Sequence, residues 1–451
     1  MLILITHFSF GQSAFENVYG YIDYMEGARA VVVTADSGFA VTGTNFVYMP
    51  PCPNGCFGSA YLLKVNGQGD TVFAKTFDAT SEGYSLIPTS DGGFAIGAFK
   101  EDSINHGIYL IKTNSFGDTI WTKSFADGGY LIAQTPDSGF FLAGSTLLKL
   151  SSIGDSLWTK DLGLALSANV LSIDQTSDSG LIISGSSVPV AKIMIVKTNS
   201  SGDTLWTKNY GDGYGWSIKQ LHDDDFMLAA GITDSASYNG VIELMKLDSI
   251  GDTLWTKKIS DVISLEVRDV VECRDAGFIL TGYTYDYNTD EGQLLLIKTD
   301  SLGTVEWKHT FSQNVNDMGF SVKQTYDGGF IVAGNTANVV TSWESDIYLI
   351  KTDSLGNIPM TANSELVSQN SEIDFTPNPT EGKIVIDNRR HTIDIIRIYD
   401  ALGKQVINYS CSSSATHESE IQIDLSALPS GIYFIQATSG EKICRGKVVK
   451  E

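Results

Sequence analysis

The chain has 451 residues, in which 53 aspartates and glutamates outnumber 30 lysines and arginines and leave a net charge of −23. A surface this acidic repels phosphate backbones and anionic lipid headgroups, which argues against nucleic acids and acidic membranes as partners. The length allows two or three domains with a large core, and no stretch after the N-terminus predicts a transmembrane segment.

The first residues, MLILITHFSFGQS, form an apolar run that ends in small and polar residues. This order is typical of the apolar core and cleavage region of a secretory signal. It predicts a short signal peptide over residues 1–11, with cleavage after Gly11. The run lacks the basic residues that usually precede such a core, so an N-terminal strand is the alternative interpretation.

A repeated unit then occupies the chain to about residue 360. Each copy opens with Asp-x-Gly-Phe or a close variant, an apolar run and a second glycine. After a variable gap it continues with a Ser-x-Gly-Asp turn and a Trp-x-Lys segment. Successive copies lie about 48 residues apart, and each holds four short segments with the residue pattern of strands. The opening motifs begin at Asp36, Asp91, Asp137, Asp178, Asp275 and Asp327, with a degraded copy at Asp223.

Units of this length with four strands indicate the blades of a β-propeller, and seven copies predict an all-β, seven-bladed propeller over residues 12–360. A linear solenoid would need polar capping repeats at its ends, and none is evident. The seventh unit lacks a Trp-x-Lys segment, whereas an additional extended segment, Val18–Tyr24, precedes the first unit. We predict that this segment forms the outer strand of the seventh blade and closes the ring.

The repeated residues have structural explanations. We expect the aspartate of Asp-x-Gly to bond the backbone of a tight turn and the glycine to take a positive φ. The second glycine is expected where backbones crowd. The aromatic residues of the Trp-x-Lys segments are expected to pack between neighbouring blades rather than on a ligand. They are Phe73, Trp121, Trp158, Trp206, Trp255 and Trp307.

Two of the four connections in each blade vary in length and composition, namely those between the second and third strands and those between blades. In an up-and-down blade both emerge on the same face, and variable loops on one face of a rigid scaffold are typical of a binding surface. Aromatic residues beside carboxylates there suit stacking on sugar rings or contact with a protein, although they would also simply cover the blades. The predicted ligand-binding residues are Tyr48, Trp216, Tyr283, Tyr285, Tyr287 and Trp343.

One variable loop carries a candidate metal site. Asp286, Asp290 and Glu291 would offer oxygen ligands to Ca²⁺, although their spacing is not that of an EF-hand. The sequence pattern requires no cofactor.

Five cysteines are present. Cys52 and Cys56 lie in one long loop and predict a disulfide suited to an exported protein, because no second Cys or His pair with ligand spacing supports a metal site. Cys411 and Cys444 form a second candidate pair, which leaves Cys273 over as a buried thiol.

The repeat stops near Thr361. Residues 361–372 are rich in Ser and Asn and are typical of a linker. Residues 373–451 contain alternating segments separated by Pro, Gly and Asn turns, which predict a small Ig-like antiparallel β-sandwich.

Motif residues follow one another through this last segment. They include Pro377, Asn378, Pro379, Gly403, Gly431, Tyr433, Lys447 and Lys450. In this order they resemble the type A C-terminal sorting domain of Bacteroidetes type IX secretion substrates. The resemblance implies export by the general secretory route, passage across the outer membrane by the type IX machinery, and release or attachment at the cell surface. An ordinary Ig-like domain is the alternative. The repeats also resemble uncharacterised propeller repeats of secreted proteins from the same bacteria, which implies a fold and no activity.

Propellers carry many activities, so the fold alone does not decide the function. The Ser-x-Gly-Asp-Thr-x-Trp turns transpose the Asp and Gly of a sialidase Asp-box, and only Arg29, Arg268 and Arg274 precede residue 372. No nucleophile motif, phosphate loop or histidine pair with ligand spacing occurs. We expect a non-enzymatic secreted protein that binds an extracellular glycan or protein through its loop face. The alternatives are a polysaccharide lyase or glycosidase, and a structural surface or matrix protein.

Overall fold

Two compact units make up the chain, Met1–Pro359 and Met360–Glu451. All secondary-structure elements in the described residues are strands. Those residues include no helix that is long and apolar enough to cross a membrane. The computed structural model describes residues 14–20, 24–47, 58–78, 81–101, 106–126, 128–144, 146–162, 169–187, 190–234, 238–337, 345–358, 375–376, 380–387, 395–400, 405–410, 420–439 and 442–450.

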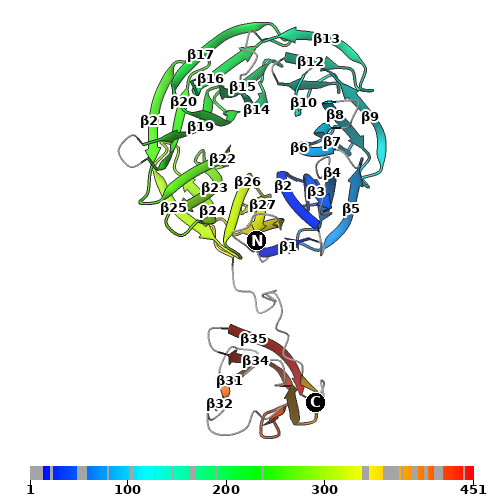
Figure 1. Ribbon diagram of the computed structural model, residues 1–451, viewed down its shortest axis with the longest axis vertical. Coiled ribbons are helices and arrows are strands. Elements are labelled where there is room, and N and C mark those ends of the chain that lie inside the picture. Colours follow the sequence, from blue (N-terminus) through cyan, green and yellow to red (C-terminus); the bar gives the residue numbers. More distant parts are fainter. Residues whose placement is uncertain are drawn as a thin grey trace, which may run out of the picture. The chain divides into compact units, whose positions relative to one another are not determined.

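The first unit is a ring of seven four-stranded antiparallel blades that follow one another in chain order (Figure 1). Blades 1 to 3 are β2 (Tyr24–Val33), β3 (Phe39–Val47), β4 (Gly58–Val65), β5 (Thr71–Phe77); β6 (Ser81–Pro88), β7 (Phe94–Glu101), β8 (His106–Thr113), β9 (Thr119–Phe125); and β10 (Leu131–Gln134), β11 (Phe140–Ala143), β12 (Thr146–Leu150), β13 (Ser156–Asp161). The predicted all-β, seven-bladed propeller is confirmed.

Blades 4 to 6 are β14 (Asn169–Gln175), β15 (Leu181–Ser186), β16 (Lys192–Thr198), β17 (Thr204–Asp212); β18 (Tyr214–Gln220), β19 (Phe226–Thr233), β20 (Gly240–Leu247), β21 (Thr253–Ile259); and β22 (Ser264–Glu272), β23 (Phe278–Asp286), β24 (Glu291–Thr299), β25 (Val305–Phe311). Blade 7 combines β26 (Asn316–Gln324), β27 (Phe330–Ala337) and β28 (Ser345–Thr352) with β1 (Phe15–Tyr19).

The N-terminal strand β1 closes the ring by pairing antiparallel with β28. The predicted closure is confirmed, but the strand spans Phe15–Tyr19 and not Val18–Tyr24. The reason lies in packing, because Phe15 takes the place of the repeat aromatic residue and only 9% of its surface is exposed. The alternation of apolar residues in the sequence does not reveal that register.

An ion pair between a lysine of the third strand and the motif aspartate recurs in all seven blades. In blade 2 the Lys112 Nζ lies 2.8 Å from the Asp91 carboxylate, which also accepts hydrogen bonds from the Thr89 hydroxyl and the Gly93 amide. Only 5% of the Lys112 side chain is exposed. The aspartate therefore closes the turn and also neutralises a buried lysine. The other pairs are Lys64–Asp36, Lys149–Asp137, Lys197–Asp178, Lys246–Asp223, Lys298–Asp275 and Lys351–Asp327.

The Asp-x-Gly turn differs in one detail from the expectation. The residue with positive φ is the middle one, such as Ser37 at 62°, and not the glycine that follows it. Gly38 is required for space, because a Cβ there would collide with the Lys64 ammonium and the Val65 carbonyl oxygen. The close approach of the buried Lys64 side chain thus explains why this position of the motif is a glycine.

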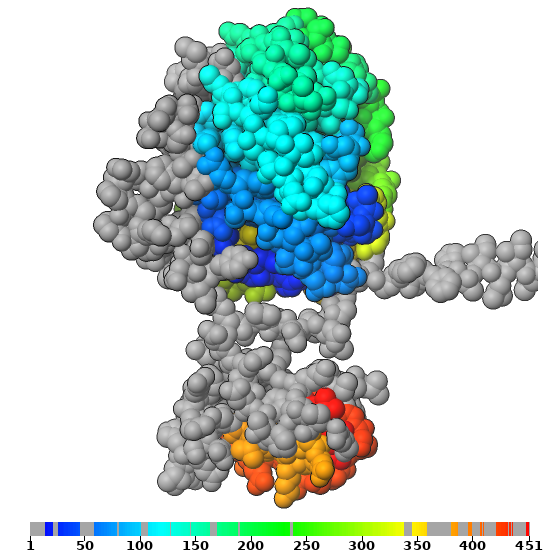
Figure 2. All heavy atoms as spheres, turned by 90° about the vertical axis from the view of Figure 1, so that its right-hand side faces the viewer, coloured from blue at the N-terminus to red at the C-terminus, as the bar shows by residue number. Residues whose placement is uncertain are grey.

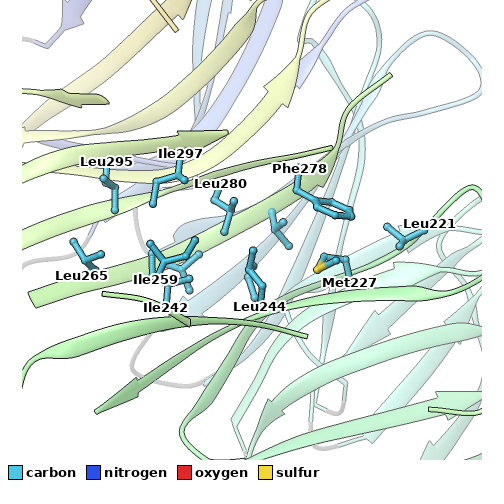
Figure 3. Packing of buried hydrophobic residues seen from close by; sticks show 13 residues of the cluster. Leu221, Met227, Ile242, Leu244, Ile259, Leu265, Phe278, Leu280, Leu295 and Ile297 are labelled. Carbon is cyan, nitrogen blue, oxygen red and sulfur yellow. The ribbon is translucent and has the colours of Figure 1, made fainter. Parts of the chain in front are cut away.

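The outer-strand aromatic residues pack between blades, as predicted. The Trp121 ring lies 5.9 Å from the Phe140 ring of the next blade, and a Cβ on Gly154 of that blade would come within 2.9 Å of Trp121. Figure 3 shows the same kind of interface between blades 5 and 6, where Leu244 and Ile242 face Leu280 and Ile297. Figure 2 shows successive blades in contact along the rim.

The second unit is a β-sandwich with one continuous core. Its buried residues include Ile384, Ile398, Ile423, Tyr433 and Val448, drawn from both sheets. The small sandwich fold is as predicted. The first sheet contains β29 (Phe375–Thr376), β30 (Lys383–Asp387) and β33 (Glu420–Asp424), and the second contains β31 (Ile395–Asp400), β32 (Gln405–Ser410), β34 (Gly431–Ser439) and β35 (Lys442–Lys450).

Candidate functional site at the propeller channel

A cavity of about 470 Å³ lies at the centre of the propeller. Its walls come from the innermost strand of every blade, namely β2, β6, β10, β14, β18, β22 and β26. The innermost strands that are labelled in Figure 1 surround the axis of the propeller. Cavities of about 300–1,000 Å³ are typical of small-ligand sites. The side chains that these seven strands present to the channel are therefore candidate ligand contacts.

A β-bulge at one repeat position shapes the channel wall. In six innermost strands the pairing skips the residue seven positions before the motif aspartate. A bulge bends a strand and changes the direction of a side chain, and all six skipped residues line the cavity. They are Arg29, Tyr84, Leu171, Trp216, Arg268 and Phe320. Together with Tyr130, which holds the same position just before β10, they are called the channel ring below.

The second glycine of the repeat makes room for this bulge. A Cβ on Gly282 would overlap the carbonyl oxygen of Glu266, and a Cβ on Gly185 would overlap that of Asn169. Both carbonyls lie two residues before the bulged position. A sequence feature expected only to mark crowded backbones is thus what allows a side chain to turn into the channel.

The shortest cation–π contact among the described residues joins blades 5 and 6. The Arg268 guanidinium carbon lies 3.7 Å from the centre of the Trp216 ring, a close cation–π contact. Arg268 Nη2 also donates a hydrogen bond of 3.0 Å to the Tyr283 hydroxyl. Trp216 Nε1 and Arg268 Nε are buried donors with no hydrogen-bond partner in the described part of the chain. Burial raises the pKa of the neighbouring Glu266 carboxyl, although the charge of Arg268 opposes the shift.

A second cluster covers blades 3, 2, 1 and 7. The Tyr84 and Tyr130 rings stack with centroids 4.3 Å apart. Arg29 lies over both Tyr84, at 5.9 Å, and Phe320, at 4.7 Å. Tyr84 donates a 2.7 Å hydrogen bond to Glu82. Burial raises the pKa of both tyrosines, so they are neutral hydroxyl groups over the working pH range.

Ion pairs occupy the channel next to the ring. Lys219 lies 3.6 Å from Asp174, and Lys323 lies 2.9 Å from Asp269. Asp269 also accepts hydrogen bonds from the Ser217 hydroxyl and the Val322 amide, so it links blades 5, 6 and 7. Burial alone would raise the pKa of Asp269, but the attraction of Lys323 and Lys219 outweighs burial and holds that pKa below its usual range.

The predicted ligand-binding residues fall into three groups. Trp216 and Tyr283 lie together against Arg268. Tyr285 and Tyr287 lie against each other at the hairpin between β23 and β24, with ring centroids 5.0 Å apart. The last two, Tyr48 and Trp343, lie outside the described residues.

The predicted calcium ligands lie at the same hairpin. Asp286 accepts hydrogen bonds of 2.9 Å from the backbone and side-chain nitrogens of Asn288, and Asp290 accepts one from the Tyr285 hydroxyl. Within the described ranges no three Asp, Glu, His or Cys side chains gather closely enough to hold a metal ion. Calcium binding here stays a prediction.

Several other predicted features lie outside the described residues. These are the signal peptide over 1–11, Cys52 and Cys56, Cys411, the linker over 361–372, Pro377 to Pro379, and Gly403. Cys273 is described and is a buried free thiol, and burial raises its pKa to about 12.

Six of the seven channel-ring residues lie outside the predicted ligand-binding set, which contains only Trp216. They are Arg29, Tyr84, Tyr130, Leu171, Arg268 and Phe320. A signal does exist, because aligning the repeats on their motif aspartates puts a large side chain at the same position in every blade. The sequence alone does not distinguish this position from the apolar positions beside it, because the bulge is visible only in the strand pairing.

The described sorting-motif residues support the sandwich. Gly431 begins β34, and the buried Tyr433 donates a 2.7 Å hydrogen bond to the Pro429 carbonyl. Lys450 is buried and donates to the Leu428 carbonyl at 2.6 Å. Lys447 lies in β35.

Residues 375–451 match the family described as the secretion system C-terminal sorting domain. The protein is therefore an exported propeller protein with a C-terminal sorting domain. That domain is the signal of the type IX secretion system, so the protein interacts with this machinery and is exported to the cell surface or the extracellular space.

Comparison with solved structures gives matches of low identity. A protein of unknown function from Bacteroides caccae is 15% identical, with 56% of this chain and 90% of that chain covered and a TM-score of 0.40. PorZ, a surface component of the type IX secretion system of Porphyromonas gingivalis, is 11% identical (92% and 69% covered, TM-score 0.33). A protein of unknown function from Dyadobacter fermentans is 8% identical (75% and 99% covered, TM-score 0.43). No curated protein matches the chain.

Proposed function

We propose that the exported propeller is a binding protein without catalytic activity that holds an extracellular glycan at the channel ring. The observation that carries this proposal is the stacked pair of Arg268 and Trp216, with the buried donors Arg268 Nε and Trp216 Nε1 left without partners in the described residues. Buried donors normally have acceptors, so a ligand rich in oxygen suits this position.

Sugars match the rest of the ring as well. Aromatic faces such as those of Trp216 and Phe320 stack on the apolar faces of sugar rings, while hydroxyl and guanidinium groups bond the sugar hydroxyls. The ring lies at the end of the innermost strands where the loops between blades enter them. Trp216 is the third residue of β18, near the point where the loop between blades enters the strand.

A polysaccharide-cleaving enzyme is the second candidate. One observation favours it, namely the Glu266 carboxyl beside Arg268, whose pKa is raised by burial and which would therefore serve as a general acid. Release of reducing sugars or unsaturated products from a bound polysaccharide would support this candidate. A protein that is purely structural would bind no glycan at all.

The test applies the full chain to a broad glycan array with and without calcium. We expect binding that falls about tenfold when Trp216 is changed to Ala, because a desolvated aromatic contact contributes about 1–2 kcal/mol and about 1.4 kcal/mol corresponds to a factor of ten. Tyr326→Ala is the matched control, since this exposed tyrosine lies in the Asp-x-Gly turn region on the opposite side of the blade. A blank array, or equal binding by the Trp216→Ala protein, would contradict the proposal. A calcium requirement would support the predicted Asp286, Asp290 and Glu291 site.

A further inference from the structure

We propose that the glycan bound at the channel ring is acidic, and that its carboxylate or sulfate groups bind Arg29 and Arg268. This inference rests on the proposed function and specifies the class of ligand. The cavity and the chain as a whole differ in the sign of their charge. The chain as a whole carries −23, whereas the cavity wall contains four cationic side chains and two carboxylates, a local charge of about +2.

The positive charge of the cavity is concentrated on the two arginines. Each lysine of the wall has a carboxylate partner, Asp174 for Lys219 and Asp269 for Lys323. Within the described part of the chain, neither Arg29 nor Arg268 has a carboxylate within ion-pair distance. Their close contacts are aromatic rings, which attract a cation without neutralising it.

The surroundings of Arg268 also fix the direction of its donors. Trp216 covers one face of the guanidinium group, and Tyr283 accepts from Nη2. This leaves Nε as an unpartnered donor. A planar guanidinium held in this way suits the two oxygens of a carboxylate or sulfate, which it binds more strongly than a neutral hydroxyl group.

The Glu266 carboxyl group interacts electrostatically with Arg268 and would compete there with an anionic ligand. Burial raises its pKa, so its charged form is disfavoured at this site. A neutral glycan would stack on the aromatic rings equally well but would leave both arginines uncompensated. An acidic glycan would neutralise them, and this difference predicts selectivity between two ligands of the same shape.

The experiment is isothermal titration of the full chain with tetragalacturonate, its carboxyl-reduced neutral counterpart and a chondroitin sulfate tetrasaccharide. We expect at least one acidic saccharide to bind tenfold or more tightly than the neutral one, with an affinity that weakens as salt is added. Arg268→Gln and Arg29→Gln should each lower that affinity about tenfold or more. Arg274→Gln is the matched control, because this arginine lies after β22 and bonds the Thr325 and Tyr326 carbonyls.

The outcomes distinguish failure of the acidic ligand from failure of the glycan site itself. Equal binding of acidic and neutral saccharides, abolished by Trp216→Ala, would overturn the acidic ligand and leave the glycan site intact. If Arg29→Gln and Arg268→Gln leave the affinity for acidic saccharides unchanged, the assignment of these two arginines as the anion-binding residues is wrong. Failure of all the saccharides here and on the array would overturn both. The comparison between saccharides uses the unaltered protein, so it holds even if a variant folds poorly.

Discussion

Phe15 stands opposite Lys351 in the pairing of β1 with β28, in the same register in which Trp121 stands opposite Lys112 in blade 2. The N-terminal strand therefore supplies the seventh copy of an aromatic residue that the last repeat lacks. Its ring lies 6.1 Å from that of Phe39 in blade 1, so the contact between the first and last blades repeats the contact found between the others.

This relationship predicts that ring closure depends on Phe15. Phe15→Ala should lower the free energy of unfolding of the propeller by about 3–5 kcal/mol, the usual cost of deleting a large buried ring. Denaturant unfolding of the full chain measures it. Val18→Ala in the same strand is the control, because Val18 is 43% exposed and its loss should cost less than about 0.5 kcal/mol. A loss from Phe15→Ala as small as that from Val18→Ala would show that the Phe15 ring contributes little to closure.

The repeated ion pair predicts unequal effects for two aspartates that both bond lysines. Asp91→Ala leaves the buried Lys112 without its partner and should destabilise the propeller by about 1–3 kcal/mol. This is less than the cost at a fully buried pair, because Asp91 is about half exposed. Asp118→Ala removes the exposed Lys75–Asp118 pair and should leave the unfolding midpoint in place. A larger loss from Asp118→Ala would contradict this account.

The lowered pKa values of the motif aspartates predict how the stability of the propeller depends on pH. Hydrogen bonds from Thr135 and Lys149 lower the pKa of Asp137 to about 2. At Asp36 and Asp91 burial would raise the pKa, but similar bonds from a threonine and a lysine outweigh it and again give a pKa of about 2. Because these values lie below those of an unfolded chain, the stabilisation is complete above a pH of about 4 and is lost as the pH falls toward 2.

Unfolding midpoints measured between pH 5 and pH 2 test this dependence. We expect a steep fall below about pH 4 in the native chain. A protein in which Asp36, Asp91 and Asp137 are all changed to Asn should be less stable at pH 5 and should show a shallower fall. The same slope in both proteins would mean that other carboxylates cause the acid sensitivity.

The architecture could be predicted from the sequence because the same pattern of turns and strands occurs in seven copies. Each Asp-x-Gly turn and each outer tryptophan can be located without knowing the strand pairing. The channel ring is different. A bulge adds one residue to a strand, so the residue that enters the channel, such as Arg29, does not follow the alternation that predicts which side chains are buried. The loop-face prediction therefore included Trp216 and Tyr283 but missed their partner Arg268, whose role depends on a contact between two blades.

Burial in the core of the sandwich predicts which residues of the sorting domain are required for export. Tyr433 is 5% exposed in the sandwich core and bonds the Pro429 carbonyl, whereas Tyr409 on β32 is 41% exposed. Tyr433→Ala should therefore disturb the sorting domain and leave the protein in the periplasm, while Tyr409→Ala should be exported normally. A chain that ends at Asn363 should also stay in the periplasm. Immunoblots of periplasmic and culture fractions from the producing bacterium measure all three. Normal export of the truncated chain would show that the sorting domain is dispensable, and retention of both tyrosine variants would show that surface residues matter as much as the core.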